Sequence, residues 1–197
     1  MTDPVHGPAR RFPPDGAGSG ASGREQSGNR PQTSGPAHRR DPRLAALSLC
    51  SDGANVLLLP AAAPCSGLRR LPSAEPRSGE GLADACRRAV AGPLHVTPEV
   101  GGLRLLVELT MVDAADAARC ENHPLHWVLA VFLCGLPTSG SLPGGAGWLP
   151  VHTLTGRDVL ETDLRFIGDA LRAGPYARYR RVHVRLQAGR LVVLRYA

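Results

Sequence analysis

The segment from Leu71 to Val96 combines an acidic residue, a short amphipathic helix and several arginines. Small or apolar residues recur at the i, i+3, i+4, i+7 and i+8 spacing of a buried helical stripe. They are Leu82, Ala85, Cys86, Ala89 and Val90. Proline lacks the N–H that a helix needs, so Gly92 and Pro93 are predicted to end this helix. Glu80 lies at its start, where the helix dipole favours a carboxylate.

The charged residues of this segment could support two kinds of chemistry. Clustered carboxylates can hold a divalent metal ion, and arginine side chains can bind phosphate oxygens. Arg77, Arg87 and Arg88 are therefore the candidate ligand-binding residues. The alternative for Arg87 and Arg88 is a solvated helix face paired with Asp84, which lies one turn before Arg88.

The order of these residues resembles a Nudix box. The family pattern is Gly, five residues, Glu, seven residues, Arg-Glu, an aliphatic residue, any residue, Glu-Glu, any residue, Gly and an aliphatic residue. The matching positions are Leu71-Pro72, Gly79-Glu80, Ala85, Arg88, Val90 and Val96. The departures are Ser73 and Ala74 at the glycine pair, Ala89, Gly92 and Pro93 at three glutamates, and His95 at the last glycine. Trp148 to Leu154 resembles the family's strand-end tryptophan block, so the resemblance covers roughly residues 43–172.

The resemblance implies a helix that presents glutamates to Mg²⁺ or Mn²⁺, which binds a diphosphate and helps to activate water. Glu80 is the one metal-binding glutamate retained, and one carboxylate does not make that site. The catalytic residues are therefore unknown, no metal or other cofactor is expected, and Glu80 would be a metal ligand only in an active enzyme. We interpret Glu80 as a dipole and cap residue. Acids that could substitute are interpreted as surface residues: Glu75, Glu99, Glu108, Asp113, Asp116 and Glu121.

Three other groups of residues have both a chemical and a structural interpretation. Cys120, His123 and His126 are suitable zinc ligands, but a proline interrupts their spacing and no fourth ligand is evident, so loop polarity is favoured. The run from Tyr176 to Arg181 interleaves aromatic and arginine residues, as some nucleic-acid binders do, but a solubilised strand edge is favoured. Cys86 lies on the apolar stripe and is predicted to be a small core residue.

Composition bounds the kind of protein. A chain of 197 residues, 43% of them hydrophobic, can form one domain with a core. Five cysteines without paired spacing fit a reducing compartment, so a cytoplasmic location is expected. Residues 1–40 are rich in Pro, Gly, Ser and Arg and are predicted to be a disordered arm without a signal peptide. Because no stretch approaches the roughly 20 apolar residues that span a bilayer, no membrane partner is expected.

Strand signals precede and follow the box. Residues 43–50 and 54–61 are predicted to pair as a hairpin around an Asp-Gly turn. Residues 95–97, 102–111 and 126–134 are predicted to be further strands.

Two helices and a hairpin are predicted after residue 154. Thr155 can cap the first helix and Asp163 the second. The predicted buried face of the second helix is Leu164, Ile167, Gly168 and Leu171. Residues 179–196 alternate apolar and basic residues and are predicted to form a hairpin that turns at Ala188-Gly189.

These elements predict an α/β fold, a Nudix-like α/β/α sandwich with a mixed sheet, plus a C-terminal β-hairpin. The expected organisation is an arm over residues 1–40, a Nudix-like domain over 41–175 and a basic hairpin over 176–197 packed on that domain. Residues 172–197 contain seven arginines and no acid, so much of the positive charge lies at this end.

Three functions are compatible with this pattern. The first is a Nudix-fold module with an inactive box that binds a nucleotide-like or phosphate-bearing ligand or a protein partner. The second is an active hydrolase of nucleoside diphosphate-linked substrates that uses acids outside the box. The third is a basic nucleic-acid-associated module that uses the C-terminal hairpin, which the sequence favours least.

Overall fold

The computed structural model describes residues 41–113, 125–136, 142, 145–188 and 190–197. All of the described residues belong to one compact unit. The predicted arm over residues 1–40 therefore lies outside the described residues. No described helix is long and apolar enough to cross a membrane.

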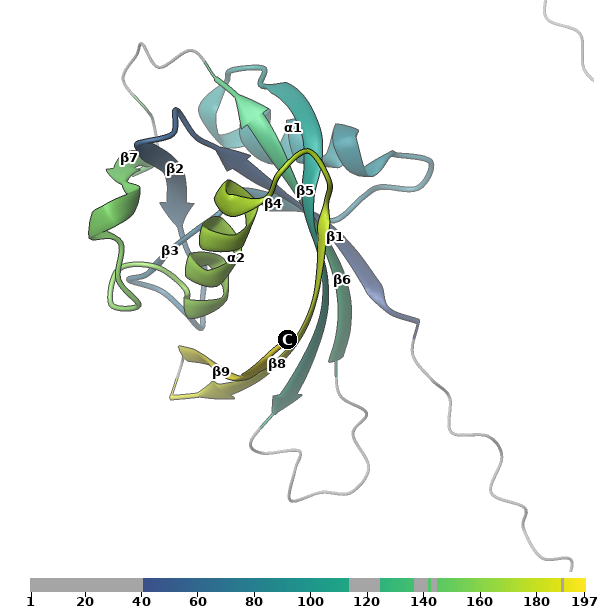
Figure 1. Cartoon of the computed structure of the whole chain (residues 1–197), viewed down its shortest axis with the longest axis vertical. Helices are drawn as coiled ribbons and strands as arrows, with labels where there is room; N and C mark the ends of the chain where they lie inside the picture. The colour runs from purple at the N-terminus through teal and green to yellow at the C-terminus, as the bar shows by residue number, and fades with distance from the viewer. Residues whose placement is uncertain (1–40, 114–124, 137–141, 143–144, 189) are drawn as a thin grey trace, which may run out of the picture. The chain divides into compact units, whose positions relative to one another are not determined.

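A six-stranded mixed sheet forms the centre of this unit, in the order β4-β1-β6-β5-β8-β9 (Figure 1). Its strands are β1 (Arg43–Cys50), β4 (Ser73–Ala74), β5 (Glu99–Asp113), β6 (Leu125–Gly135), β8 (Arg178–Gln187) and β9 (Arg190–Tyr196). The pairs β1–β6 and β5–β8 are parallel, whereas β1–β4, β5–β6 and β8–β9 are antiparallel. The predicted strands over residues 43–50 and 126–134 are confirmed.

A second, three-stranded sheet has the order β3-β2-β7. Its strands are β2 (Asn55–Pro60), β3 (Arg69–Arg70) and β7 (Gly147–Pro150), and the short helix η1 (Val151–Thr153) follows β7. The predicted β1–β2 hairpin is wrong, because a single bridge between Ser51 and Val56 joins the two strands before they enter different sheets. The turn itself forms, since the Asp52 carboxylate accepts the N–H groups of Ala54 and Asn55.

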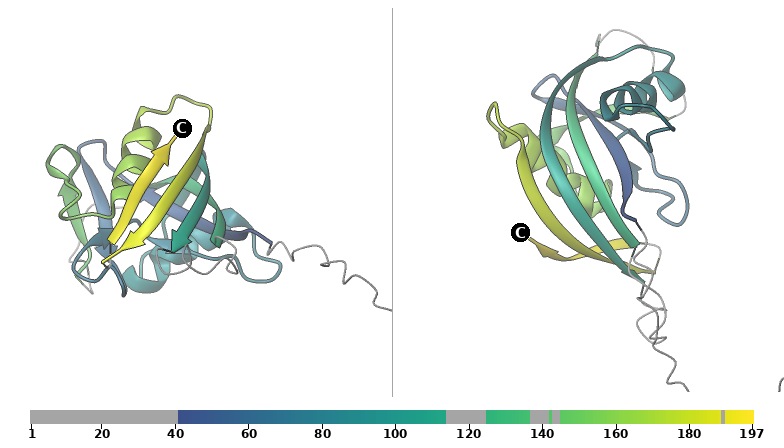
Figure 2. Two further views of the ribbon diagram at one scale, coloured as in Figure 1. Left: turned by 90° about the horizontal axis from the view of Figure 1, so that it is seen from below. Right: turned by 90° about the vertical axis from the view of Figure 1, so that its right-hand side faces the viewer.

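Two helices cover opposite faces of the six-stranded sheet (Figures 1 and 2), as the predicted α/β/α sandwich requires. Helix α1 (Leu82–Leu94) packs on Ala46 and Cys50 of β1 and on Cys134 of β6. Helix α2 (Glu161–Arg172) packs on the alternate residues of β1, such as Leu47. Each face of β1 is therefore buried, which explains its nearly continuous apolar sequence.

Helix α1 continues through Gly92 and Pro93, so the predicted end of the helix is wrong. Pro93 lies in the last turn, where it removes one backbone hydrogen bond but leaves the rest of the helix intact. Leu94 is 5% exposed, and His95, at φ 56°, donates its backbone N–H to the carbonyl of Ala91. Burial of Leu94 and this left-handed cap keep the last turn helical. The predicted strand at residues 95–97 does not form, and β5 begins at Glu99.

Helix α2 begins without the predicted caps. Thr155 forms a turn in which its hydroxyl bonds to Asp158, and no helix begins near residue 156. The N-cap of α2 is Leu160, and Asp163 lies inside the helix with its carboxylate buried. The helix faces the core with Phe166, Ile167 and Ala170, so of the predicted face Ile167 is fully buried, whereas Leu164, Gly168 and Leu171 are half-buried.

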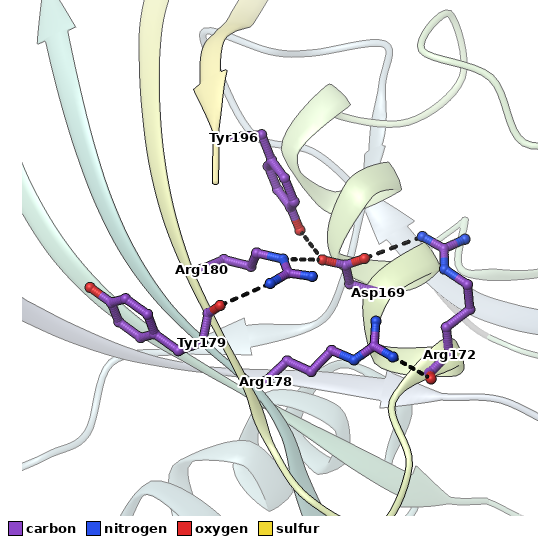
Figure 3. Close-up of polar contacts among 6 residues, drawn as sticks. All are labelled: Asp169, Arg172, Arg178, Tyr179, Arg180 and Tyr196. Carbon is purple, nitrogen blue, oxygen red and sulfur yellow. Dashed lines mark hydrogen bonds and ion pairs between the residues drawn. The ribbon is translucent and has the colours of Figure 1, made fainter.

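The C-terminal hairpin is confirmed, and its first strand extends the six-stranded sheet because β8 pairs with β5. As predicted, Val182 and Val184 are buried and Arg181 and Arg185 are exposed. The hairpin is joined to α2 by Asp169, whose carboxylate accepts hydrogen bonds from three side chains (Figure 3). The donors are Arg180 Nε at 2.6 Å, Tyr196 Oη at 2.9 Å and Arg172 Nη2 at 3.2 Å.

Candidate functional site

The box carboxylate Glu80 is paired with Arg88. Nε of Arg88 lies 2.9 Å from Glu80 Oε1, and Nη2 lies 2.7 Å from Oε2, so both carboxylate oxygens are engaged. Oε2 also accepts the backbone N–H of Arg77 at 2.7 Å. The hydrogen bond from Arg88 is the main reason that the pKa of Glu80 falls to about 2. The N-cap of α1 is Gly81 without a side-chain cap, so the interpretation of Glu80 as a cap residue is wrong.

The helix spacing predicts that Arg88 pairs with Asp84, and this prediction is wrong. Asp84 accepts a hydrogen bond from Arg87 instead. Nη2 of Arg88 reaches back to the carbonyl of Glu75 at 2.7 Å, so this arginine fastens the loop that precedes α1. Of the three predicted ligand-binding arginines, Arg77 is the exposed one, Arg87 is held by Asp84 and Arg88 is held by Glu80.

A Mg²⁺ or Mn²⁺ ion needs several hard oxygen ligands, and the residues of α1 do not fit this requirement. Ala89 is 7% exposed and packs into the core, while Gly92 and Pro93 carry no oxygen ligand on their side chains. Both oxygens of Glu80 already accept hydrogen bonds from Arg88. In the described part of the chain, no three His, Cys, Asp or Glu side chains gather as a metal site would require.

Of the acids that could substitute, Glu99, Glu108 and Asp113 lie along β5, and Glu75 follows β4. Glu75 pairs with Arg43 at 2.6 Å, and Glu108 pairs with Arg181 at 3.1 Å. Glu99 is an exposed residue at the start of β5. Asp116 and Glu121 lie outside the described residues.

The possible zinc ligands are described in part. Cys120 and His123 lie outside the described residues, and His126 is in β6. Its Nε2 lies 3.1 Å from Glu108 Oε1, without the alignment of a hydrogen bond.

Cys86 is fully buried, as predicted, and contacts Ser48 at 3.0 Å and Cys134 at 3.5 Å. Its hydrogen bond with Cys134 and its burial raise the pKa of the Cys86 thiol strongly. A thiol that stays protonated and buried does not act as a nucleophile.

A cleft of about 460 Å³ lies between α2 and the neighbouring face of the six-stranded sheet. Apolar walls come from Leu47 of β1, Leu109 of β5, Leu129 of β6 and Phe166 of α2. Its volume lies within the range of small-molecule pockets, which are mostly apolar with a few placed polar groups.

The polar groups that line the cleft include a buried carboxyl. Asp163 is 5% exposed, and its Oδ2 accepts the backbone N–H of Leu71 at 2.7 Å. Burial raises the pKa of this carboxyl above its ordinary value. Thr162 and Arg70 also line the cleft, and the Arg70 guanidinium bonds to the hydroxyl of Ser73. A buried carboxyl with a perturbed pKa beside an arginine in a cleft is typical of functional sites.

The rim of the cleft is connected to the box loop through Glu75. The guanidinium of Arg43 lies 4.3 Å from the ring centroid of Trp127 and bonds to the Glu75 carboxylate. The backbone carbonyl of the same Glu75 accepts a hydrogen bond from Arg88 of α1. Neither the cleft residues Trp127 and Asp163 nor Arg43 at the rim are predicted as site residues, because each lies in a different element and no local spacing joins them.

The chain matches no protein-family model and no curated protein sequence. Its fold is similar to that of solved structures. A Nudix hydrolase from Nitrosomonas europaea is 16% identical, over 74% of this chain and 81% of that chain, with a TM-score of 0.57. The MutT protein from Bacillus halodurans is 15% identical over 79% and 96% of the two chains, also with a TM-score of 0.57. This chain has a Nudix fold. The Nudix domain of Shewanella oneidensis NrtR, solved with ADP-ribose, is 19% identical over 68% and 90%, with a TM-score of 0.50.

Proposed function

We propose that this Nudix-fold chain is a binding module for an anionic, nucleotide-like ligand and that its box helix does not hydrolyse the ligand. Two observations carry the proposal: both Glu80 oxygens are paired with Arg88, and a separate cleft between α2 and the sheet has a ligand-sized volume. A carboxylate held in this way serves the structure of the box loop. The cleft remains accessible to a ligand.

The cleft suits a ligand with a flat or apolar group at one end. Leu47, Leu129 and Phe166 supply apolar contact, and the partly exposed ring of Trp127 lies at the rim. Asp163 and Thr162 can form hydrogen bonds with the polar edge of a ligand ring, which a cleft lined by hydrocarbon alone could not do.

The arginines near the cleft suit an anionic group on the same ligand. Arg70 lines the cleft, and Arg43 is at its rim. Arg77 follows Glu75 by two residues and is exposed. Guanidinium groups bind phosphate and carboxylate oxygens with two parallel hydrogen bonds. We therefore expect the phosphate-bearing end of the ligand to lie on the box-loop side of the cleft.

The test is a binding panel of ADP-ribose, dinucleoside polyphosphates and nucleoside triphosphates, measured by calorimetry. ADP-ribose is a reasonable first probe because the Nudix domain of NrtR was solved with it. Arg70→Gln should weaken binding by roughly 10- to 100-fold, the value of a charge-assisted hydrogen bond. Arg69→Gln is the matched control, since the neighbouring Arg69 guanidinium bonds instead to the carbonyl of Gly145.

Two results would contradict the proposal. One is a panel in which no compound binds the full chain. The other is phosphate release that needs Mg²⁺ or Mn²⁺ and is lost in Glu80→Gln. This second result would establish the alternative, an active hydrolase that recruits acids from outside the box.

A further inference from the structure

Four side chains alternate between ring and cation along one face of β8. They are Tyr179, Arg181, His183 and Arg185. The intervening residues Val182 and Val184 are buried toward α2, which places the four on the opposite face. Because a strand rises about 3.3 Å per residue, neighbouring members of this row are about 6.6 Å apart.

Within the described part of the chain, this face of β8 is open. Helix α1 covers the same side of the sheet, but over Ala46, Cys50 and Cys134 of β1 and β6. Among the described elements, no helix lies over β8 or β9 on this side (Figure 2). Tyr179 is 50% exposed, and the Arg181 side chain is 59% exposed.

The strand register adds further basic groups to the row. His183 lies beside Arg195 of β9, and Thr110, which pairs with His183, lies beside His126 of β6. The acidic side chain that the register places here is Glu108, opposite Arg181. Glu108 already bonds to the hydroxyl of Tyr179 and to Arg181 Nε at 3.1 Å. The face is therefore cationic, and its tyrosine is held in place by the one carboxylate.

We propose that this open face of β8 and β9 binds single-stranded nucleic acid. Arg181, Arg185 and Arg195 contact phosphates, while the rings of Tyr179 and His183 stack on bases. Surfaces that bind single strands combine a positive track for the backbone with exposed rings for the bases. An acidic peptide would use the charges but leave the rings without a role. The proposal is independent of the cleft, which lies on the α2 side of the sheet.

The sequence alone favours a solubilised strand edge over a nucleic-acid site. The structure shows that the arginines of residues 172–197 do not all serve one surface. Arg172 and Arg180 bond to Asp169 on the α2 side, and Arg178 bonds to the carbonyl of Arg172 (Figure 3). The fold therefore separates these structural arginines from those of the open face.

The experiment measures binding of fluorescent oligo(dT) and oligo(rU) to the full chain over a series of salt concentrations. The test variant carries Arg181→Gln, Arg185→Gln and Arg195→Gln. It should lower the slope of log K against log salt by about 2, since each phosphate contact to a single strand contributes about 0.7. The control variant removes the same charge on the α2 side, through Arg157→Gln, Arg165→Gln and Arg172→Gln, and should leave that slope nearly unchanged.

Tyr179 separates stacking from simple charge attraction. Tyr179→Ala should weaken binding roughly 5- to 100-fold, the value of one base stacked on an aromatic ring. Tyr179→Phe keeps the ring but loses the hydroxyl bond to Glu108, so it should retain most of the binding that Tyr179→Ala loses. Thermal melts establish that each variant is folded.

Three results would overturn the proposal. The first is no binding of either oligonucleotide at low salt. The second is an equal loss of binding in the test and control variants, which would mean that net charge alone attracts the oligonucleotide. The third is equally tight binding of poly-glutamate with no effect of Tyr179→Ala, which would indicate an acidic protein partner.

Discussion

The hydroxyl of Tyr196 donates a 2.9 Å hydrogen bond to Oδ2 of Asp169, which joins the last strand of the sheet to helix α2. The same oxygen accepts Arg180 Nε from the neighbouring strand. Asp169 is 7% exposed, so its negative charge is kept in a poorly hydrated position by these donors. A carboxylate held in this way couples α2, β8 and β9.

Removing either partner should destabilise the chain, and the two losses should not add. We expect Tyr196→Phe to lower the free energy of unfolding by about 1 kcal/mol and Asp169→Asn by about 2 kcal/mol. The double variant should lose less stability than the sum of the two single losses, because both single changes remove the same hydrogen bond. Denaturant titration of the four proteins measures the coupling. Strictly additive losses would show that the bond contributes nothing. Arg87→Gln is the control, since its exposed ion pair with Asp84 on α1 should be worth under about 1 kcal/mol.

Two aspartates of α2 should give opposite pH dependences. Burial alone raises the pKa of Asp169, but hydrogen bonds from Arg180, Tyr196 and Arg172 outweigh it and lower the pKa below its ordinary value. Asp169 therefore stabilises the fold above the unfolded pKa of about 4, and this contribution is lost as pH falls. Burial raises the pKa of Asp163, so its ionisation opposes folding as pH rises through the same region.

The measurement compares Asp169→Asn and Asp163→Asn with the original chain at pH 3 and pH 7. Relative to the original chain, Asp169→Asn should be less stable at pH 7 than at pH 3. Asp163→Asn should show the reverse, because it removes a carboxyl that resists ionisation in the fold. A pH effect of the same sign in both variants would contradict this interpretation.

The pair of Glu80 and Arg88 should make the box loop sensitive to acid. The pKa of Glu80 is lowered to about 2, chiefly by Arg88, from an ordinary value near 4.5. The contribution of the pair is therefore present above about pH 4.5 and lost as pH falls toward 2. Arg88→Gln should lower the melting temperature at pH 6 and have a shrinking effect in acid. Arg87→Gln is the control, because its ion pair with Asp84 is exposed. A difference that is constant from pH 6 to pH 2 would sink the idea.

Local patterns in the sequence predict the elements of this fold better than their partners. The stripe of α1, the strand over residues 126–134 and the C-terminal hairpin each follow from periodicity and a turn signal within one segment. The pairing of β1 does not, because its parallel partner β6 lies about 80 residues away. Asp52 stabilises the turn after β1 through local hydrogen bonds. The strand that lies beside β1 depends instead on the burial of both faces of β1, which a local pattern does not contain.

The candidate site is harder to predict for the same reason. Helix spacing pairs Arg88 with Asp84, yet Glu80 in the preceding loop offers both oxygens to Arg88 and excludes that pair. The cleft combines Arg70, Trp127 and Asp163 from β3, β6 and α2, and only the folded sheet brings them together. The residues next to Asp163 in the sequence do not indicate that its carboxyl is buried, because the burial comes from other elements.

Residues 1–40 should be dispensable for folding, a prediction that rests on their composition. They have few aliphatic residues and no apolar period, so they cannot contribute much buried surface. A chain that begins at Asp41 should melt at the temperature of the full chain. Because about 1 kcal/mol moves the melting temperature of a domain of this size by a few degrees, a loss of several degrees on truncation would show that the prediction is wrong.

The last prediction concerns catalysis at α1. Diphosphate hydrolysis needs charge neutralised on the phosphate oxygens and a water made nucleophilic at neutral pH. Helix α1 has Ala89, Gly92 and Pro93 where the family has glutamates, and its retained Glu80 is paired with Arg88. We therefore expect no phosphate release from ADP-ribose, dinucleoside polyphosphates or nucleoside triphosphates above background with Mg²⁺ or Mn²⁺.

Restoring one glutamate should not restore activity. Ala89 is 7% exposed and packs with Ala85 and Val90, so Ala89→Glu would place a carboxylate in the core. An unpaired buried charge costs several kcal/mol, and we expect a large fall in melting temperature without metal-dependent turnover. Ala83→Glu is the matched control, since Ala83 is exposed on the same helix and should tolerate the change. If Ala89→Glu instead remains folded and gains turnover that Glu80→Gln abolishes, position 89 faces a workable metal site and our account of the helix is wrong.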